Sequence, residues 1–462
     1  MRRSACLLFA AASLLLALCP AAAATRPRYG GTLRVALSAS PTSLDPVQQS
    51  VFPTSTQEQL ATLMFDRLVE LDQQGMPRPN LAISWQHDSD SRRWLFHLQS
   101  GVLLHNGSPL RPHLVVMSLS ASNPNWRVRL QGDDVVVESG NPIPNLLAEL
   151  GCARNSIVVH TEAGAVVGTG PFRVSAWEAG KRLVLAANDD YWGGRPFLDS
   201  IEITFARSQR DQALDLQLGR ADVVELPPDQ VRRAQQEGVR VAVSAPAELI
   251  ALAFSDKPSV KEPALREAIS LSIDRAAIQS TLLQKQGEAA ASLLPQWVSG
   301  YSFLFPVTGE LERARQLRRD LGSTPSLTLA YDWNDPLARA IAERVSVNAR
   351  DIGIAIQPYG ENLAVRGANA DLRVVRIPLA SSDAAATLSA LSAATGRQSV
   401  MPTASPEDLY ATDRALRSDF RLVPITYVPQ AWALAARVRN WVTPRQGGWR
   451  LADVWLEEGD KP

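Results

Sequence analysis

The residues best suited to chemistry in this chain are scattered, and none of the common catalytic patterns is present. The sequence contains no nucleophile elbow, P-loop, complete GxGxxG, paired CxxC or HExxH. The Gly-Thr-Gly at 168–170 lacks the third glycine of a dinucleotide loop, and the Gly-Lys at 180–181 is followed by Arg182, where a P-loop needs a hydroxyl. We therefore expect no enzyme, no catalytic residue and no cofactor. A secreted hydrolase stays an alternative, because catalytic triads are defined by geometry.

The histidines and the cysteine also suggest no metal or redox chemistry. His97, His105 and His113 are spaced evenly along the chain. That spacing suits neither one helix face nor the close ligand pairs of structural zinc. We interpret them as structural histidines and predict no metal site. Cys152 is the only cysteine beyond the first 24 residues, so we expect a small buried side chain and no internal disulfide.

The first 24 residues have the pattern of a secretory signal peptide. A basic start is followed by an apolar run over 5–18 and by small residues at 20–24, so cleavage is expected near Thr25. Lipidation of Cys19 is the less favoured alternative, because Leu18 stands where lipoprotein processing needs a small residue. No later stretch approaches the roughly 18 consecutive apolar residues of a spanning helix. We predict an export signal and a periplasmic or otherwise extracytoplasmic location.

Composition limits the possible partners. The 462 residues, 45% hydrophobic and 20% charged, are enough for two or three cores. Basic and acidic residues number 47 each, so there is no overall field to attract nucleic acid. We expect a monomer that does not bind nucleic acid.

Hydrophobic spacing indicates an α/β chain. Apolar residues at intervals of three and four predict a helix from Thr56 to Gly75, another opened by Pro263 and a third over 337–345. Alternating or continuous apolar runs predict strands. The strand candidates are 32–37, 94–98, a hairpin over 128–137, 182–187, 200–205, 249–254 and 352–356.

Five groups of segments, read in order, carry a family resemblance. GTGPF at 168–172, continued by NDDYWGG at 188–194, is the strongest of them. The other groups are 29–36 with 43–46, 65–70 with 79–85, 96–107, and 218–223 with 265–275. Together they resemble the family 5 extracellular solute-binding proteins, which include dipeptide-, oligopeptide- and nickel-chelate-binding proteins. The similarity spans most of residues 29–360.

The resemblance implies an α/β, two-lobed, periplasmic-binding-protein-like fold of type II, cluster C-like. Its first lobe is discontinuous, and its accessory α+β domain is reduced because the stretch between Leu119 and Val135 is short. The expected division is 1–24 signal peptide; 25–45, 166–246 and 425–462 lobe I; 46–165 accessory domain; and 247–424 lobe II. Hinge residues are expected where the chain passes between lobes, at Asp45, Gly168, Gly170 and Pro246.

The resemblance also implies a function. The chain is expected to be the exported substrate-binding component of an ABC transporter, capturing peptides in an interlobe cleft and delivering them to an inner-membrane permease. A metal chelate or another small solute is the alternative ligand.

The segment that in peptide-binding members receives the peptide's amino terminus has a different pattern here. Those members present an aspartate in a stretch rich in Gly-Trp and Asp-Pro, and residues 376–383 occupy the comparable place. Asp383 could pair with an ammonium group, or it could cap a helix that begins at Ala384, which is the favoured reading. Ser382, Arg376 and Trp333 complete the predicted ligand-binding set.

Overall fold

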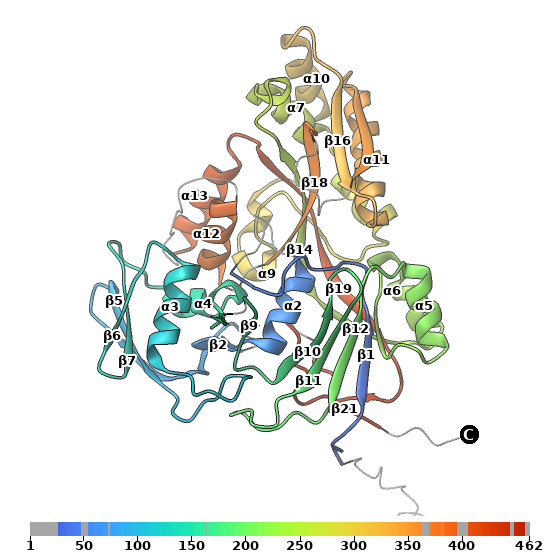
Figure 1. Cartoon of the computed structure of the whole chain (residues 1–462). Helices are drawn as coiled ribbons and strands as arrows, with labels where there is room; N and C mark the ends of the chain where they lie inside the picture. Colours follow the sequence, from blue (N-terminus) through green and yellow to red (C-terminus); the bar gives the residue numbers. More distant parts are fainter. Residues whose placement is uncertain are drawn as a thin grey trace, which may run out of the picture.

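One large sheet organises the molecule. The computed structural model describes residues 26–47, 54–72, 74–162, 164–361, 369–379, 381, 383–394, 405–443 and 448–457. Within this part eleven strands form a mixed sheet in the order β10-β11-β12-β1-β13-β19-β14-β18-β16-β17, with β15 paired to β19 (Figure 1). The predicted signal peptide, Cys19 and Ser382 lie outside the described residues.

The lower end of the sheet in Figure 1 is built around the first strand. Its strands are β1 (Thr32–Ala36), β10 (Phe172–Glu178), β11 (Arg182–Ala187), β12 (Ser200–Thr204) and β13 (Val223–Glu225). Leu33 and Val35 of β1 are buried while Thr32 and Arg34 are partly exposed, as alternation predicted; Ala36 is buried as well, in a small core on the other face. Helix α2 (Ser55–Met64) packs on the core that contains Leu33, and α5 (Gln209–Gln217) and α6 (Val231–Gln236) lie on the other side.

The upper end carries a second core. Its strands are β16 (Leu327–Asp332), β17 (Ile356–Glu361) and β18 (Leu372–Pro378), and its helices are α7 (Pro263–Ser272), α10 (Leu311–Asp320) and α11 (Pro336–Asp351). The helices predicted at Pro263 and over 337–345 are therefore confirmed, whereas the last predicted strand begins at Ile356 and extends beyond it. Ile269, Ile341 and Val345 are fully buried in this core. Helices α12 (Ala384–Ala394) and α13 (Pro406–Arg417) contribute to a third core, which among the described residues includes Ile377 of β18 but no residue of β16 or β17.

Two long antiparallel strands, β14 (Arg240–Phe254) and β19 (Leu422–Leu434), join the two ends. Each contributes to the lower core and to the upper one. Their register shifts on either side of Pro246, which lies opposite Pro429. Neither proline has an N–H for the ladder, which explains an irregular joint at this point. The strand predicted at 249–254 is thus half of a longer one, and the chain does not leave the sheet at Pro246.

A smaller unit stands beside the lower end. Its antiparallel sheet has the order β4 (Ala82–His87), β5 (Arg93–Leu98), β7 (Asp134–Glu138) and β6 (Arg127–Gln131), covered by α3 (Pro112–Ser122) and α4 (Leu146–Leu150). Gly132, with φ +63°, makes the turn of the predicted β6–β7 hairpin. This unit has a separate core around Phe96 and Val135.

The helix predicted to reach Gly75 is wrong beyond its first half. Helix α2 ends at Met64, and β2 (Val69–Leu71) pairs with β3 (Pro77–Pro79). The apolar spacing persists past the true end because the later residues enter a different core. Leu60 and Leu63 belong to the lower core, whereas Leu68 belongs to the accessory core.

The remaining elements are short. They are β8 (Val159–His160), β9 (Val166–Val167), β15 (Glu288–Ala289), β20 (Val438–Arg439), β21 (Trp455–Leu456), α8 (Arg275–Ala277), α9 (Gln296–Ser299), the 3₁₀ turns Ala153–Asn155, Pro228–Gln230, Pro258–Val260 and Ser302–Leu304, and a π turn at Ile278–Leu282. Among the described residues, no helix has both the length and the apolar character needed to cross a membrane.

Candidate functional site

A chain of polar contacts links α2 to the upper half of the molecule. Arg376 on β18 donates from Nε to Glu248 Oε2 on β14 (2.9 Å) and from Nη1 to Asp335 Oδ2 (3.0 Å). Ser55 at the start of α2 donates its hydroxyl to Glu248 Oε1 (2.9 Å). Glu248 is buried and lies two residues beyond Pro246. We call Ser55, Glu248, Arg376 and Asp335 the junction cluster; it connects α2, β14, β18 and the N-terminus of α11.

The charges of the junction cluster are largely matched within it. Burial lowers the pKa of Arg376, but Glu248 and Asp335 outweigh burial and the pKa is raised overall. Asp335 also caps α11, accepting from the backbone N–H groups of Leu337 and Ala338 at 3.0 Å each. Arg376 is therefore held as a bridge between two carboxylates. A ligand anion would have to compete with both for this guanidinium.

Helix α2 turns further polar side chains toward the joint. Glu58 and Gln59 follow Ser55 at spacings that place them on the same helix face. Gln59 Nε2 donates to Gln430 Oε1 on β19 (3.3 Å). Glu58 is only 6% exposed, and within the described part its Oε2 has no hydrogen-bond partner. Burial raises the pKa of Glu58 to about 8, although Arg154 and Arg67 act to lower it.

The sequence reasoning did not single out Glu58. One signal was available: Glu58 stands within the run of α2 residues whose spacing predicted a buried helix face, and a buried carboxylate is uncommon. Its surroundings come from a distant segment. Arg154 donates to Glu149 through Nε (2.8 Å) and Nη2 (2.5 Å), and Glu149 also accepts from Asn155 (3.0 Å).

Asp383 is a helix cap. Its Oδ1 accepts from the N–H of Ala386 (2.8 Å) at the start of α12, so the favoured reading from the sequence is confirmed. Burial, together with the charge of Glu149, raises the pKa of Asp383, and the capping hydrogen bonds oppose this. The pairing of Asp383 with a ligand remains a prediction.

Trp333 and Ser382 are less informative. Trp333 is 63% exposed in the turn between β16 and α11, two residues before Asp335, and its backbone N–H donates to the carbonyl of Glu361 (3.1 Å). A flat exposed ring beside the junction cluster suits contact with a ligand. Ser382 lies outside the described residues.

The predicted hinge residues lie in closely packed surroundings. A Cβ on Gly168 would lie 2.2 Å from the carbonyl oxygen of Met64, and one on Gly170 would lie 2.5 Å from the carbonyl carbon of the same residue. Only glycine allows this approach to the end of α2. Asp45 accepts from His160 Nε2 (2.8 Å). Close packing accounts for both glycines, and a hinge role remains a prediction.

The remaining histidines and the cysteine do not converge on a site. His97 pairs with Asp134 (2.7 Å), His105 lies against the carbonyl of Gly170 (3.0 Å), and His113 is exposed. Cys152 is buried, and burial raises the pKa of its thiol to about 12, so it is protonated at neutral pH. In the described ranges no three His, Cys, Asp or Glu side chains form a metal-binding group.

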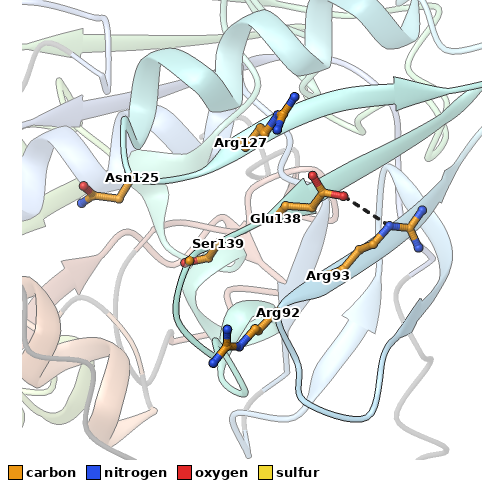
Figure 2. A pocket seen from close by; sticks show the side chains of 7 residues that line it. Arg92, Arg93, Asn125, Arg127, Glu138 and Ser139 are labelled. Atoms are coloured by element: carbon orange, nitrogen blue, oxygen red, sulfur yellow. Dashed lines mark ion pairs between the residues drawn. The ribbon is translucent and has the colours of Figure 1, made fainter.

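A shallow hollow of about 380 Å³ lies on the accessory sheet. It is lined by Arg92, Arg93, Asn125, Arg127, Glu138, Ser139 and Gly140. Figure 2 shows Arg93 beside Glu138. The side chains of Arg92 and Arg127 point away from Glu138 and away from each other (Figure 2). Because these guanidinium groups diverge, the hollow lacks the convergent donors of an anion site.

Comparison with known proteins agrees with the family resemblance. The model described as "bacterial extracellular solute-binding proteins, family 5 middle" matches residues 76–399. Probable di/tripeptide-binding protein 5 of Pseudomonas aeruginosa is 26% identical over 400 residues, covering 76% of this chain and 73% of that protein.

Two further relatives match over shorter parts of their own length. YhjP of Bacillus subtilis is 34% identical over 182 residues, or 36% of this chain and 31% of that protein. The probable D,D-dipeptide-binding periplasmic protein DdpA of Escherichia coli is 24% identical over 308 residues, or 60% of each chain. The chain therefore spans about a third of the first and three fifths of the second.

Solved structures share the fold over nearly the whole chain. DppA of Helicobacter pylori in complex with the peptide STSA has a TM-score of 0.81 at 19% identity, covering 94% of this chain and 99% of that one. AppA of Bacillus subtilis in complex with a nonapeptide has a TM-score of 0.79 at 17% identity, covering 94% and 100%. The two-lobed α/β fold expected from the sequence is confirmed by these matches.

Proposed function

This chain belongs to the bacterial extracellular solute-binding proteins of family 5, and from that premise we propose that it is the exported substrate-binding component of an ABC transporter. It captures a peptide, or another small solute, between its two lobes and delivers it to a permease in the inner membrane. It works as a monomer in the periplasm or an equivalent compartment. The family consists of binding proteins, and we propose that this member likewise makes and breaks no covalent bond.

The observation that carries the proposal is the junction cluster. Ser55 on α2, a helix packed in the lower core, and Arg376 on β18 meet at Glu248, so one buried carboxylate connects that helix to the upper end of the sheet. A contact of this kind exists only while the ends are held together. Ligand contacts made from both ends would favour the same closed arrangement, which is how a binding protein converts occupancy into a shape that a permease recognises.

The boundaries of the lobes are part of the proposal. The proposed division is lobe I as 25–45, 166–246 and 425–462, the accessory domain as 46–165, and lobe II as 247–424. Separate cores at the two ends of the sheet and in the accessory unit support a division into three parts, with α2 of the 46–165 segment packed in the lower core. The paired prolines Pro246 and Pro429 are the natural place for bending, since the ladder is already interrupted there.

Charge favours a ligand that carries a cationic group. Glu58 is buried and Asp383 is half-buried, and neither carboxyl group makes an ion pair within the described part of the chain. The amino terminus of a peptide would supply the missing positive charge. The di/tripeptide-binding relative from Pseudomonas aeruginosa supports the same ligand class.

A metal chelate is the second candidate ligand. The nickel-binding periplasmic protein of Escherichia coli is 23% identical over 370 residues, covering 70% of each chain. NikA of Staphylococcus aureus in complex with Ni(L-His)2 has a TM-score of 0.79 at 18% identity, covering 92% of this chain and 100% of that one. A chelate brings its own ligands to the metal, so the protein would need to supply only polar and aromatic contacts.

Calorimetric titration of the purified protein tests the proposal. Di- to pentapeptides, a nickel–histidine chelate and free nickel are titrated into wild type and into Asp383→Asn. Asparagine caps helices as well as aspartate does, so the variant keeps α12 and loses only the charge. We expect saturable peptide binding that weakens by about tenfold in the variant, the equivalent of one charge-assisted hydrogen bond.

Other results would change the assignment. Saturable binding of the chelate alone would move the ligand to the second candidate. If none of the peptides or the chelate binds, the proposed ligand classes are wrong and the family fold serves another solute.

A further inference from the structure

A small cavity lies beneath the last turns of α7 and α13. Its volume is about 130 Å³, and its polar lining comprises Ser270, Arg275, Thr308, Glu310 and Arg417. A single water needs only about 10–15 Å³ by the same measure, so there is room for a small ion with some of its hydration. No residue of the junction cluster lines this cavity.

Arg275 is the central feature of this cavity. It is 6% exposed, and its Nε donates to the carbonyl oxygens of Ala290 (2.8 Å) and Pro424 (3.0 Å), while Nη1 donates to that of Ser270 (3.3 Å). Within the described part of the chain no carboxylate pairs with Arg275, and Nη2 has no acceptor there. Three carbonyl dipoles fix the position of the guanidinium, but they do not neutralise its full charge.

A second guanidinium faces the same cavity. Arg417 ends α13 and donates from Nε to buried Asp413 (2.9 Å), and its guanidinium carbon lies 3.9 Å from the centre of the Phe305 ring. Burial, followed by repulsion from Arg417, lowers the pKa of Arg275 to about 10. Glu310 also lines the cavity but is exposed, and it is not among the charges that act on Arg275. Asp413 balances the charge of Arg417, whereas the charge of Arg275 has no carboxylate partner within the described part of the chain.

We propose that this cavity binds a small oxyanion, either a free inorganic ion or the carboxylate of an organic molecule, between Arg275 and Arg417. Planar guanidinium groups match the paired oxygens of such ions. Phe305, Phe420 and Leu422 line the cavity as well and reduce its hydration, which strengthens the attraction. The site is separate from the proposed solute site and does not depend on it.

Thermal unfolding of the full chain tests this site. Phosphate, sulfate and acetate are compared with sodium chloride at equal ionic strength. We expect a saturable rise of about 2 °C or more in the unfolding midpoint with at least one oxyanion, because a ligand of the native state stabilises it. If phosphate or sulfate raises the midpoint and acetate does not, the ligand is a free inorganic ion. If acetate also raises the midpoint, the ligand is a carboxylate.

A matched pair of variants locates the effect without disturbing the buried arginine. Thr308 is exposed at the rim of the cavity. Thr308→Glu supplies a tethered carboxylate, so it should raise the midpoint without added anion and abolish the oxyanion shift. Thr308→Gln has the same size without the charge and should keep the shift. Equal shifts in both variants, or no saturable shift beyond chloride in wild type, would overturn the proposal.

Discussion

The buried carboxyl of Glu58, whose Oε2 has no hydrogen-bond partner among the described residues, makes the stability of this protein depend on pH in a defined direction. Burial raises the pKa of Glu58 from 4.5 to about 8, so the folded state binds the proton more tightly than the unfolded chain does. The protonated form is the favourable one inside the protein. Stability is therefore greatest below pH 4.5 and is lost as the pH rises toward 8.

The size of the effect follows from the same two values. A tenfold change in an equilibrium constant is about 1.4 kcal/mol. Relative to its value at low pH, the free energy of unfolding therefore falls by about 3 kcal/mol at pH 7 and by ~5 kcal/mol above pH 8. Glu58→Gln keeps the shape and one acceptor oxygen but cannot ionise. We expect this variant to match wild type near pH 4 and to exceed it by these amounts at higher pH.

Urea unfolding of wild type and Glu58→Gln at half-unit steps from pH 4 to pH 9 measures the difference. Taking the difference between the two proteins removes the contribution of other titrating groups, including Asp413. Glu178, exposed at the end of β10, provides the control substitution Glu178→Gln, for which the curve should follow wild type. Parallel curves for Glu58→Gln and wild type would refute the account of a buried, unpaired carboxyl.

Three further predictions concern residues that hold the fold. Gly168→Ala should lower the free energy of unfolding by about 3 kcal/mol, because its Cβ would lie 2.2 Å from the Met64 carbonyl oxygen. Gly140→Ala should change the free energy of unfolding little, because no atom lies within contact of a Cβ at that position. Chemical denaturation measures both variants. Arg376→Gln should lower the free energy of unfolding by about 2 kcal/mol, because Glu248 loses its ion-pair partner. This value is smaller than for a fully buried pair because the Arg376 side chain is 36% exposed. Arg313→Gln, which removes an exposed ion pair, is the control. Burial raises the pKa of Asp413 from 3.8 to about 6, so the free energy of unfolding should fall by about 3 kcal/mol as the pH rises through this range. Asp413→Asn should remove this fall when unfolding is measured at a series of pH values. If the variant shows the same dependence of the unfolding free energy on pH as wild type, the prediction is contradicted.

Local patterns in the sequence predicted most elements and the family. Alternation around Leu33 and Val35 marked β1, Pro263 opened α7, and Asp383 before Ala384 marked the start of α12. Each of these signals involves residues two to four positions apart, whose relative directions are set by the backbone alone. The order of the family segments then selected the two-lobed fold, which the structural matches confirm.

The same local rules failed where two cores meet. The spacing that starts at Leu60 continues through Leu68, yet the helix ends at Met64 because the later residue packs in the accessory core. The strand predicted at 249–254 begins earlier, at Arg240, because β19 supplies a partner strand on both sides of Pro246. Periodicity reports that a side chain is buried and does not report against which segment.

The candidate sites were decided by tertiary structure. Ser55 and Glu248 are 193 positions apart, and Glu248 and Arg376 are 128 apart, so no local pattern could join them. The sequence by itself determined the α/β elements and the family, and it predicts an export signal. Only packing decided that Glu58 became buried, that Arg376 came to lie between two carboxylates, and that Arg275 has no carboxylate partner within the described part of the chain. The physical reason is that the energy of a charge depends on its surroundings, which are assembled from distant parts of the chain.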